Sequence, residues 1–107
     1  MSLIAKTPKP PYYVVIFTSL REEQDDGYSL MAEQMVALAA QQPGFLGIES
    51  AREEVGITVS YWRDLSSIKK WKEHSEHKMA QKLGVERYYS AFKTRIAKVE
   101  RDYGKDL

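Results

Sequence analysis

The chain has 107 residues, a length typical of one compact domain. Its 16 Lys and Arg residues against 15 Asp and Glu give a net charge of +1, without the basic stripe that marks a nucleic-acid-binding protein. It has no cysteine, which excludes disulfides and thiolate chemistry, and no apolar run as long as a transmembrane helix. We therefore expect a cytoplasmic protein that binds neither nucleic acid nor membrane.

The first 26 residues predict an arm, a strand and the start of a helix. Three of the four residues 8–11 are proline, so residues 1–11 are expected to form a flexible arm ahead of a single domain over residues 12–107. Residues 12–20, YYVVIFTSL, are aromatic or β-branched almost throughout, which is typical of a strand. Both faces of this strand are apolar, so both need cover. Asp25 and Asp26 then offer N-caps for a helix.

The rest of the chain predicts one more helix and three more strands. Met31, Met35, Leu38 and Gln42 fall at helical spacing, and Pro43-Gly44 ends the first helix. Residues 45–53 and 56–64 are expected to be strands joined by a short turn. Ser66 is expected to cap a second helix that runs to Leu83 and stops at Gly84. Residues 88–103 predict the last strand.

This order, βαββαβ, indicates an α+β fold of the ferredoxin-like type, with a four-stranded antiparallel sheet and two helices on one face. Two helices cover only one face of the sheet. Because the first strand is apolar on both faces, we expect a second copy of the chain to cover the other face in a sheet-to-sheet homodimer.

Several motifs resemble the antibiotic biosynthesis monooxygenase family of dimeric α+β barrel proteins. They are QQPGFLGIES, then TVSYWRDLSSIKKWKEHSEHKMAQKLGVERYYSAF, and finally RIAKVERDYG. The resemblance implies a dimer with a ligand pocket between sheet and helices. It also implies several chemistries, among them cofactor-independent oxygenation of aromatic compounds and heme degradation.

The heme-degrading branch of this family implies an asparagine on the first strand and a tryptophan on the second helix, with a histidine ten residues later. Trp71 matches the tryptophan, but Gln81 stands at the histidine position and residues 12–20 contain no asparagine. Heme degradation by that mechanism is therefore disfavoured, while looser heme binding stays an alternative.

Aromatic residues are the first candidates for a ligand pocket. Trp71 lies on an apolar helical stripe with Ile68 and Met79, which packing alone would explain. It can equally form one wall of a pocket for a planar ligand, as can Trp62 and Phe92. Tyr89 is a candidate hydrogen-bond donor. Tyr61 and Trp62 should face opposite sides of the sheet, one toward the helices and the other toward the dimer side, because neighbours on a strand point apart.

The two histidines, His74 and His77, are three residues apart and show no metal-ligand pattern, so we expect no metal site. On a continuous helix both point away from the stripe of Ile68 and Met79. A helix break at Ser75 would turn His77 inward, and the family resemblance favours this position. His77 is therefore the candidate base, and His74 an additional pocket residue.

These expectations combine into a function. The leading hypothesis is a monooxygenase that needs no cofactor and acts on a small planar aromatic such as a quinol or an anthrone. The first alternative is a non-catalytic ligand-binding or stress-response dimer, and the second is a heme-binding protein.

Overall fold

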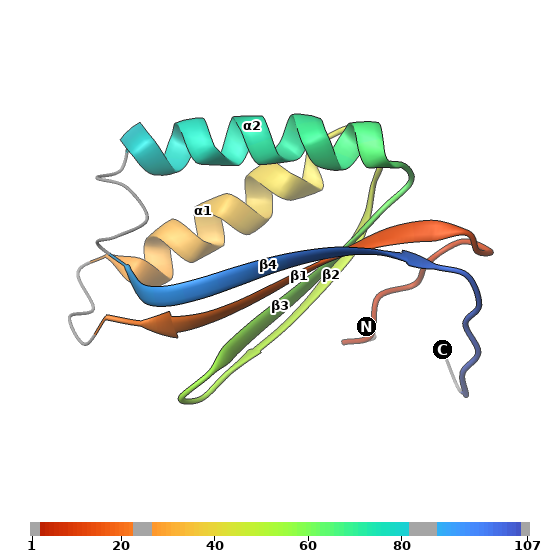
Figure 1. Ribbon diagram of the computed structural model, residues 1–107, viewed down its shortest axis with the longest axis horizontal. Coiled ribbons are helices and arrows are strands. Elements are labelled where there is room, and N and C mark those ends of the chain that lie inside the picture. The colour runs from red at the N-terminus through yellow and green to blue at the C-terminus, as the bar shows by residue number, and fades with distance from the viewer. Residues whose placement is uncertain (1–2, 23–26, 82–87, 106–107) are drawn as a thin grey trace.

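The computed structural model in Figure 1 describes residues 3–22, 27–81 and 88–105, without the side chains of residues 77 and 79–81. Its elements are β1 (Tyr12–Arg21), α1 (Tyr28–Ala40), β2 (Phe45–Arg52), β3 (Gly56–Trp62), α2 (Leu65–Gln81) and β4 (Tyr89–Val99). The predicted order is confirmed. The expected caps and stops at Asp25, Asp26, Leu83 and Gly84 lie outside the described residues.

The four strands form one antiparallel sheet in the order β2-β3-β1-β4. Residues opposite each other on antiparallel strands point to the same face. Val15 pairs with Ser60 and with Ile96, and Val14 pairs with Tyr61 and with Ala97. These pairings assign every residue of β1, β3 and β4 to one of two faces.

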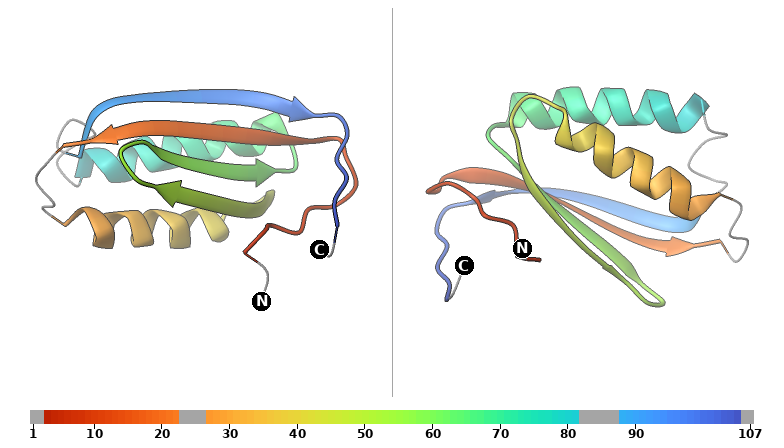
Figure 2. Two further views of the ribbon diagram at one scale, coloured as in Figure 1. Left: turned by 90° about the horizontal axis from the view of Figure 1, so that it is seen from below. Right: turned by 180° about the vertical axis from the view of Figure 1, so that it is seen from behind.

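Both helices cover one face of the sheet, which we call the inward face (Figure 1). Seen from below, α1 runs along the β2 side, while α2 lies behind β1 and β4 (Figure 2). The inward face carries Tyr13, Val15, Phe17 and Ser19 on β1, Ser60 and Trp62 on β3, and Phe92, Thr94, Ile96 and Lys98 on β4. The other side, the outer face, carries Tyr12, Val14, Ile16, Val59 and Tyr61.

Two clusters of buried residues join the helices to the inward face. Ala39, Trp62 and Ile68 form the first, at the end of the sheet where α2 begins. Met31 and Tyr88 form the second, near the start of α1. The split of Tyr61 from Trp62 across the sheet is confirmed, since Trp62 packs with the helices and Tyr61 lies against Tyr12 on the outer face.

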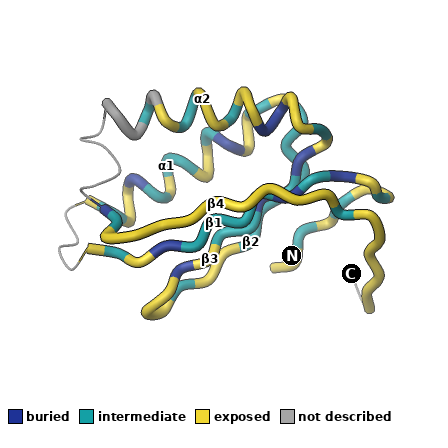
Figure 3. Tube along the Cα trace, viewed as in Figure 1, coloured by how far each residue is buried: buried dark blue, intermediate teal, exposed yellow. Residues whose placement is uncertain are grey.

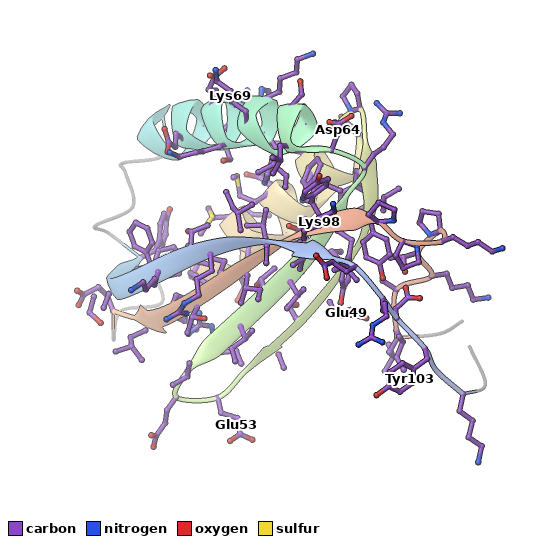
Figure 4. The ribbon with its side chains drawn as sticks, turned by 45° about the vertical axis from the view of Figure 1, so that its right-hand side comes forward. Glu49, Glu53, Asp64, Lys69, Lys98 and Tyr103 are labelled. Atoms are coloured by element: carbon purple, nitrogen blue, oxygen red, sulfur yellow. The ribbon has the colours of Figure 1, made fainter. Side chains whose placement is uncertain are left out.

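Helix α2 differs from the prediction at its start. It begins at Leu65, because the Asp64 carboxylate accepts a hydrogen bond from the Ser67 backbone N–H at 2.8 Å. Asp64 is therefore the cap, and the prediction of Ser66 was wrong. Figure 4 shows Asp64 at this end of α2 and Lys69 on the side of α2 away from the sheet.

Of the two alternatives for the second helix, a break at Ser75 or a continuous helix, the structure has the continuous one. The helix is continuous through Ser75, whose hydroxyl donates to the Lys72 carbonyl at 3.0 Å within the same helix. A serine hydroxyl satisfied in this way leaves the helix intact, which is the common alternative to capping a new one.

The N-terminal arm lies against the outer face. The Ala5 N–H donates to Glu49 at 2.9 Å and the Thr7 hydroxyl donates to the Tyr12 hydroxyl at 2.9 Å. The Tyr12 hydroxyl in turn donates to Asp102 at 2.5 Å, so arm and C-terminal segment meet at one end of the sheet. Among the described residues, no helix is both long and apolar enough to cross a membrane.

Candidate functional site

The site begins with the two tryptophans, which β3 and α2 bring together. Trp71 and Trp62 stack with ring centroids 6.0 Å apart and an interplanar angle of 23°. Trp62 is fully buried, and its indole N–H donates to the Ser60 hydroxyl at 2.9 Å. Trp62 therefore supports Trp71 from behind, and Trp71 is the half-buried ring of the pair.

A second aromatic group lies toward the other end of the inward face. Phe17 on β1 contacts Tyr89 and Phe92 on β4, with ring centroids 5.3 and 5.6 Å away. Tyr89 meets Tyr28 of α1 edge to face at 5.8 Å. Tyr88 also contacts Tyr28, so both residues of the tyrosine pair pack against α1.

Between these two groups the inward face of β4 is open. Ile96 and Phe92 point to the helix side of the sheet, yet they are 50% and 52% exposed. Figure 3 shows exposed residues along almost the whole of β4. An apolar residue that faces a helix layer is normally buried, so α2 leaves this part of the sheet accessible. We call Trp71, Val15, Ile96 and Phe92 the open site.

Tyr89 supplies a phenol at the edge of the open site. Burial, and then the Tyr28 hydroxyl at 3.5 Å, raise the pKa of Tyr89 above its ordinary value. The guanidinium of Arg21 lies 4.0 Å from the centre of the Tyr28 ring and that of Arg52 lies 5.6 Å from it. Both arginines oppose this rise in the pKa of Tyr89 without cancelling it. Tyr89 therefore stays protonated at neutral pH, as a hydrogen-bond donor must.

The histidines are placed differently from the prediction. The ring of His74 lies against Trp71, with centroids 6.2 Å apart, so the expectation that it points away from the tryptophan was wrong. Its Nε2 is buried and has no hydrogen-bond partner among the described residues. An unpaired buried polar atom costs about 1–3 kcal/mol, so it calls for an explanation. His77 lies on α2, but its side chain is outside the described part of the chain.

The sequence revealed only part of the side of α2 that faces the sheet. The half-buried or buried residues are Ser67, Ile68, Trp71, His74, Ser75 and Lys78, whereas Leu65 is exposed. Ile68 and Trp71 of the predicted stripe lie on the inward side, and His74, Ser75 and Lys78 share it with them, which apolar spacing did not indicate. Val15 and Ile96 were also missed as site residues, and only their shared face after strand pairing could have identified them.

Within the described residues, no three His, Asp or Glu side chains gather as a metal site would require. What the site contains is a stacked indole, an accessible apolar floor, a protonated phenol and an imidazole nitrogen without a partner. This arrangement suits a planar ligand that carries at least one polar group.

The chain is thus a ferredoxin-like α+β protein with a group of aromatic side chains between sheet and helices. Residues 11–83 match the family described as Antibiotic biosynthesis monooxygenase, and the chain belongs to this family. It is 52% identical over 103 residues to the uncharacterized protein YqjZ of Bacillus subtilis (strain 168), which covers 94% of this chain and 90% of that protein.

Two solved structures illustrate the fold. SnoaB of Streptomyces nogalater, a cofactor-independent oxygenase, has a TM-score of 0.68 at 13% identity over 88% of this chain and 98% of its own. PA3566 of Pseudomonas aeruginosa has a TM-score of 0.67 at 16% identity, over 90% of this chain and 99% of its own. At such identities the likeness concerns the fold alone.

Proposed function

We propose that this protein is a cofactor-independent monooxygenase that acts on a small, planar, electron-rich aromatic compound such as a quinol or an anthrone. The observation that carries the proposal is the open site: Ile96 and Phe92 face the helices and yet remain half exposed, beside the stacked ring of Trp71. A flat apolar ring can lie on this floor with one face against an indole. The activity named for SnoaB supports the same class of reaction on this fold.

The reaction proposed for an anthrone balances with O₂ as the only co-reactant. A base removes a proton from the activated CH₂ carbon, and the resulting carbanion passes one electron to O₂. The radical pair joins to form a C–O bond, and the peroxide takes up a proton. Loss of water then breaks the O–O bond and leaves a C=O group, so one oxygen atom enters the product and the other leaves as water.

The protein's part in this reaction is to hold the ring, to exclude water and to stabilise negative charge as it develops. Trp71 and the floor of Val15 and Ile96 would hold the ring. The protonated Tyr89 phenol would donate a hydrogen bond to an oxygen of the ligand. His77 is the base that the sequence favours.

The test is oxygen uptake by purified, metal-stripped protein with a panel of quinols, anthrones and catechols. We expect uptake above autoxidation in the wild type and a large loss in Trp71→Ala. Equal uptake by wild type, Trp71→Ala and heat-denatured protein would be background chemistry and would contradict the proposal.

The alternatives give different results in the same preparation. A non-catalytic ligand-binding or stress-response protein would show a thermal shift with the same aromatics and no oxygen uptake, because the open site alone suffices for binding. A heme-binding protein would show a Soret band at stoichiometric heme. We expect none, since Gln81 stands where the heme-degrading branch has histidine.

We also propose that the protein forms a homodimer through the outer face. This face presents Ile16, Val59 and Ile57 on the two central strands, and both helices lie on the opposite side (Figure 1). Burying such a surface is favourable at about 25 cal/mol per Å² of apolar area. Light scattering on a sizing column should give twice the mass of the 12.3 kDa chain, and a monomer at micromolar concentration would contradict the proposal.

A further inference from the structure

His74 stands out because a polar atom inside the protein has no partner there. Its Nε2 is buried and receives or donates no hydrogen bond among the described residues. Buried polar atoms are nearly always paired, and the exceptions are often functional or held by a bound molecule. The imidazole ring that carries this nitrogen packs against Trp71, which in turn stacks on Trp62.

The continuity of α2 determines the side from which His74 acts. Three residues after Trp71, it lies on the same side of the helix, and its ring is 6.2 Å from the indole at an interplanar angle of 34°. The residues on the far side of α2, Lys69, Lys70, Lys72, Glu73 and Glu76, are exposed. His74 is half-buried between these two sides. At about 100° per residue, position 77 lies roughly 120° around the helix from Trp71.

The charges that face the space between helices and sheet favour an anion over a second cation. The titratable groups that face the space between helices and sheet are Lys78 on α2, Lys98 and Tyr89 on β4, Tyr13 and Arg21 on β1, Arg52 on β2 and Tyr28 on α1. None of these groups in the described part of the chain is a carboxylate. Lys78 lies one turn beyond His74 on the same side of the helix, and it is half-buried.

On the basis of the function proposed above, we propose that His74 is the catalytic base and that the substrate class is a planar aromatic with an acidic hydroxyl, a phenol or an enol. The hydroxyl O–H bond breaks and the proton joins the lone pair of Nε2, in the tautomer that carries its own proton on Nδ1. The electron pair stays on the ligand oxygen. The result is an imidazolium beside a phenolate or enolate, with Lys78 as the second cation near that anion.

This proposal explains why the nitrogen has no partner within the protein: the ligand hydroxyl supplies it. It also separates the roles of the two histidines. His74 touches the substrate, and His77, which the sequence favoured, does not act as the base.

Ionisation can be tested apart from oxygen chemistry with a hydroxyanthraquinone dye such as alizarin, which changes colour when its phenol loses a proton. The dye is mixed with the protein under argon, and the absorbance spectrum gives the ratio of ionised to neutral bound dye. We expect the wild type to ionise the dye at a pH where the free dye is mostly neutral. His74→Gln keeps a polar side chain that cannot accept the proton of the dye. This variant should still bind the dye and lower the ratio of ionised to neutral dye at least about tenfold.

Three further variants exclude a purely structural role. In His74→Ala, added imidazole should restore the colour change, which a packing defect would not allow. The exposed control Glu73→Gln should behave as the wild type, and His77→Gln tests the competing assignment of the base. Circular dichroism confirms that each variant is folded.

The outcomes separate the two proposals. Ionisation that depends on His74 without any oxygen uptake would sustain the assignment of the base and refute the oxygenase. Undiminished ionisation in His74→Gln, loss of ionisation in His77→Gln, or no spectral change when dye meets the wild type would each overturn the assignment.

Discussion

Two isoleucines on opposite faces of the sheet give the sharpest test of where the site lies. Ile96 on the inward face is 50% exposed and Ile57 on the outer face is 45% exposed. Full burial of an isoleucine side chain is worth about 1.5–3 kcal/mol, so truncating a half-buried one to alanine should cost roughly 1 kcal/mol. In a domain of this size that lowers Tm by about 4–6 °C.

The two variants should therefore lose similar stability but differ in ligand binding. In Ile96→Ala the exposed half of the side chain no longer contacts the ring of the ligand, a loss of about 1 kcal/mol or roughly five- to tenfold in Kd. Ile57→Ala should bind the ligand as the wild type does, and any effect should fall on dimer dissociation.

The assay is quenching of Trp71 fluorescence by a non-reactive planar aromatic, with Tm measured on the same samples. Equal weakening of ligand binding in both variants, or weakening in Ile57→Ala alone, would refute the assignment of the site to the inward face.

Three further predictions concern the framework of the site. The Ser67 hydroxyl and backbone N–H, and then Arg63, hold the pKa of Asp64 below its ordinary value. A lowered pKa in the folded state stabilises the protein above the unfolded pKa, and this stabilisation is lost as the pH falls through the folded value. Asp64→Ala should therefore be less stable than wild type at pH 7, and urea unfolding should show the gap closing below about pH 4. The raised pKa of Tyr89 gives the opposite dependence of stability on pH. Its stabilisation is present below the unfolded pKa and is lost as the pH rises. Tyr89→Phe should accordingly reduce the loss of stability above about pH 10, and an unchanged slope would contradict the burial of this phenol. Gly44 has φ of +84°, and a Cβ there would lie 2.7 Å from that of Ser67. Gly44→Ala should thus lower stability by at least about 1–2 kcal/mol, and a wild-type Tm would refute this turn geometry.

The order of elements could be predicted from the sequence because each one has a strong local signal. The strand at residues 12–20 is β-branched or aromatic almost throughout, and Pro43-Gly44 ends the first helix. Strand neighbours point apart by geometry, so the separation of Tyr61 from Trp62 also followed.

The site could be predicted only in part, because α2 does not follow the rule that apolar residues face inward. Its inward side changes from Ile68 and Trp71 to His74, Ser75 and Lys78, while Leu65 is exposed. A helix over an open site has less core to cover in that region, so apolar periodicity places Ile68 and Trp71 on the inward side but gives no signal for the polar residues beside them. His74 was assigned to the wrong side for this reason, although the choice of Trp71 and Phe92 as pocket residues did not depend on it.

The register between β1 and β4 was equally out of reach. Val15, Phe17, Phe92 and Ile96 are distant in sequence and share one face only through the strand register. Such long-range register is set by the whole sheet rather than by any short segment.

The most direct test of the central claim is a reaction with isotopically labelled O₂ and an anthrone, followed by mass spectrometry of the product. We predict that one labelled oxygen atom enters each product molecule, with one O₂ consumed per product, and that Trp71→Ala and Ile96→Ala slow this incorporation. Product without the label, or the same rate of incorporation in protein-free buffer, would contradict the account.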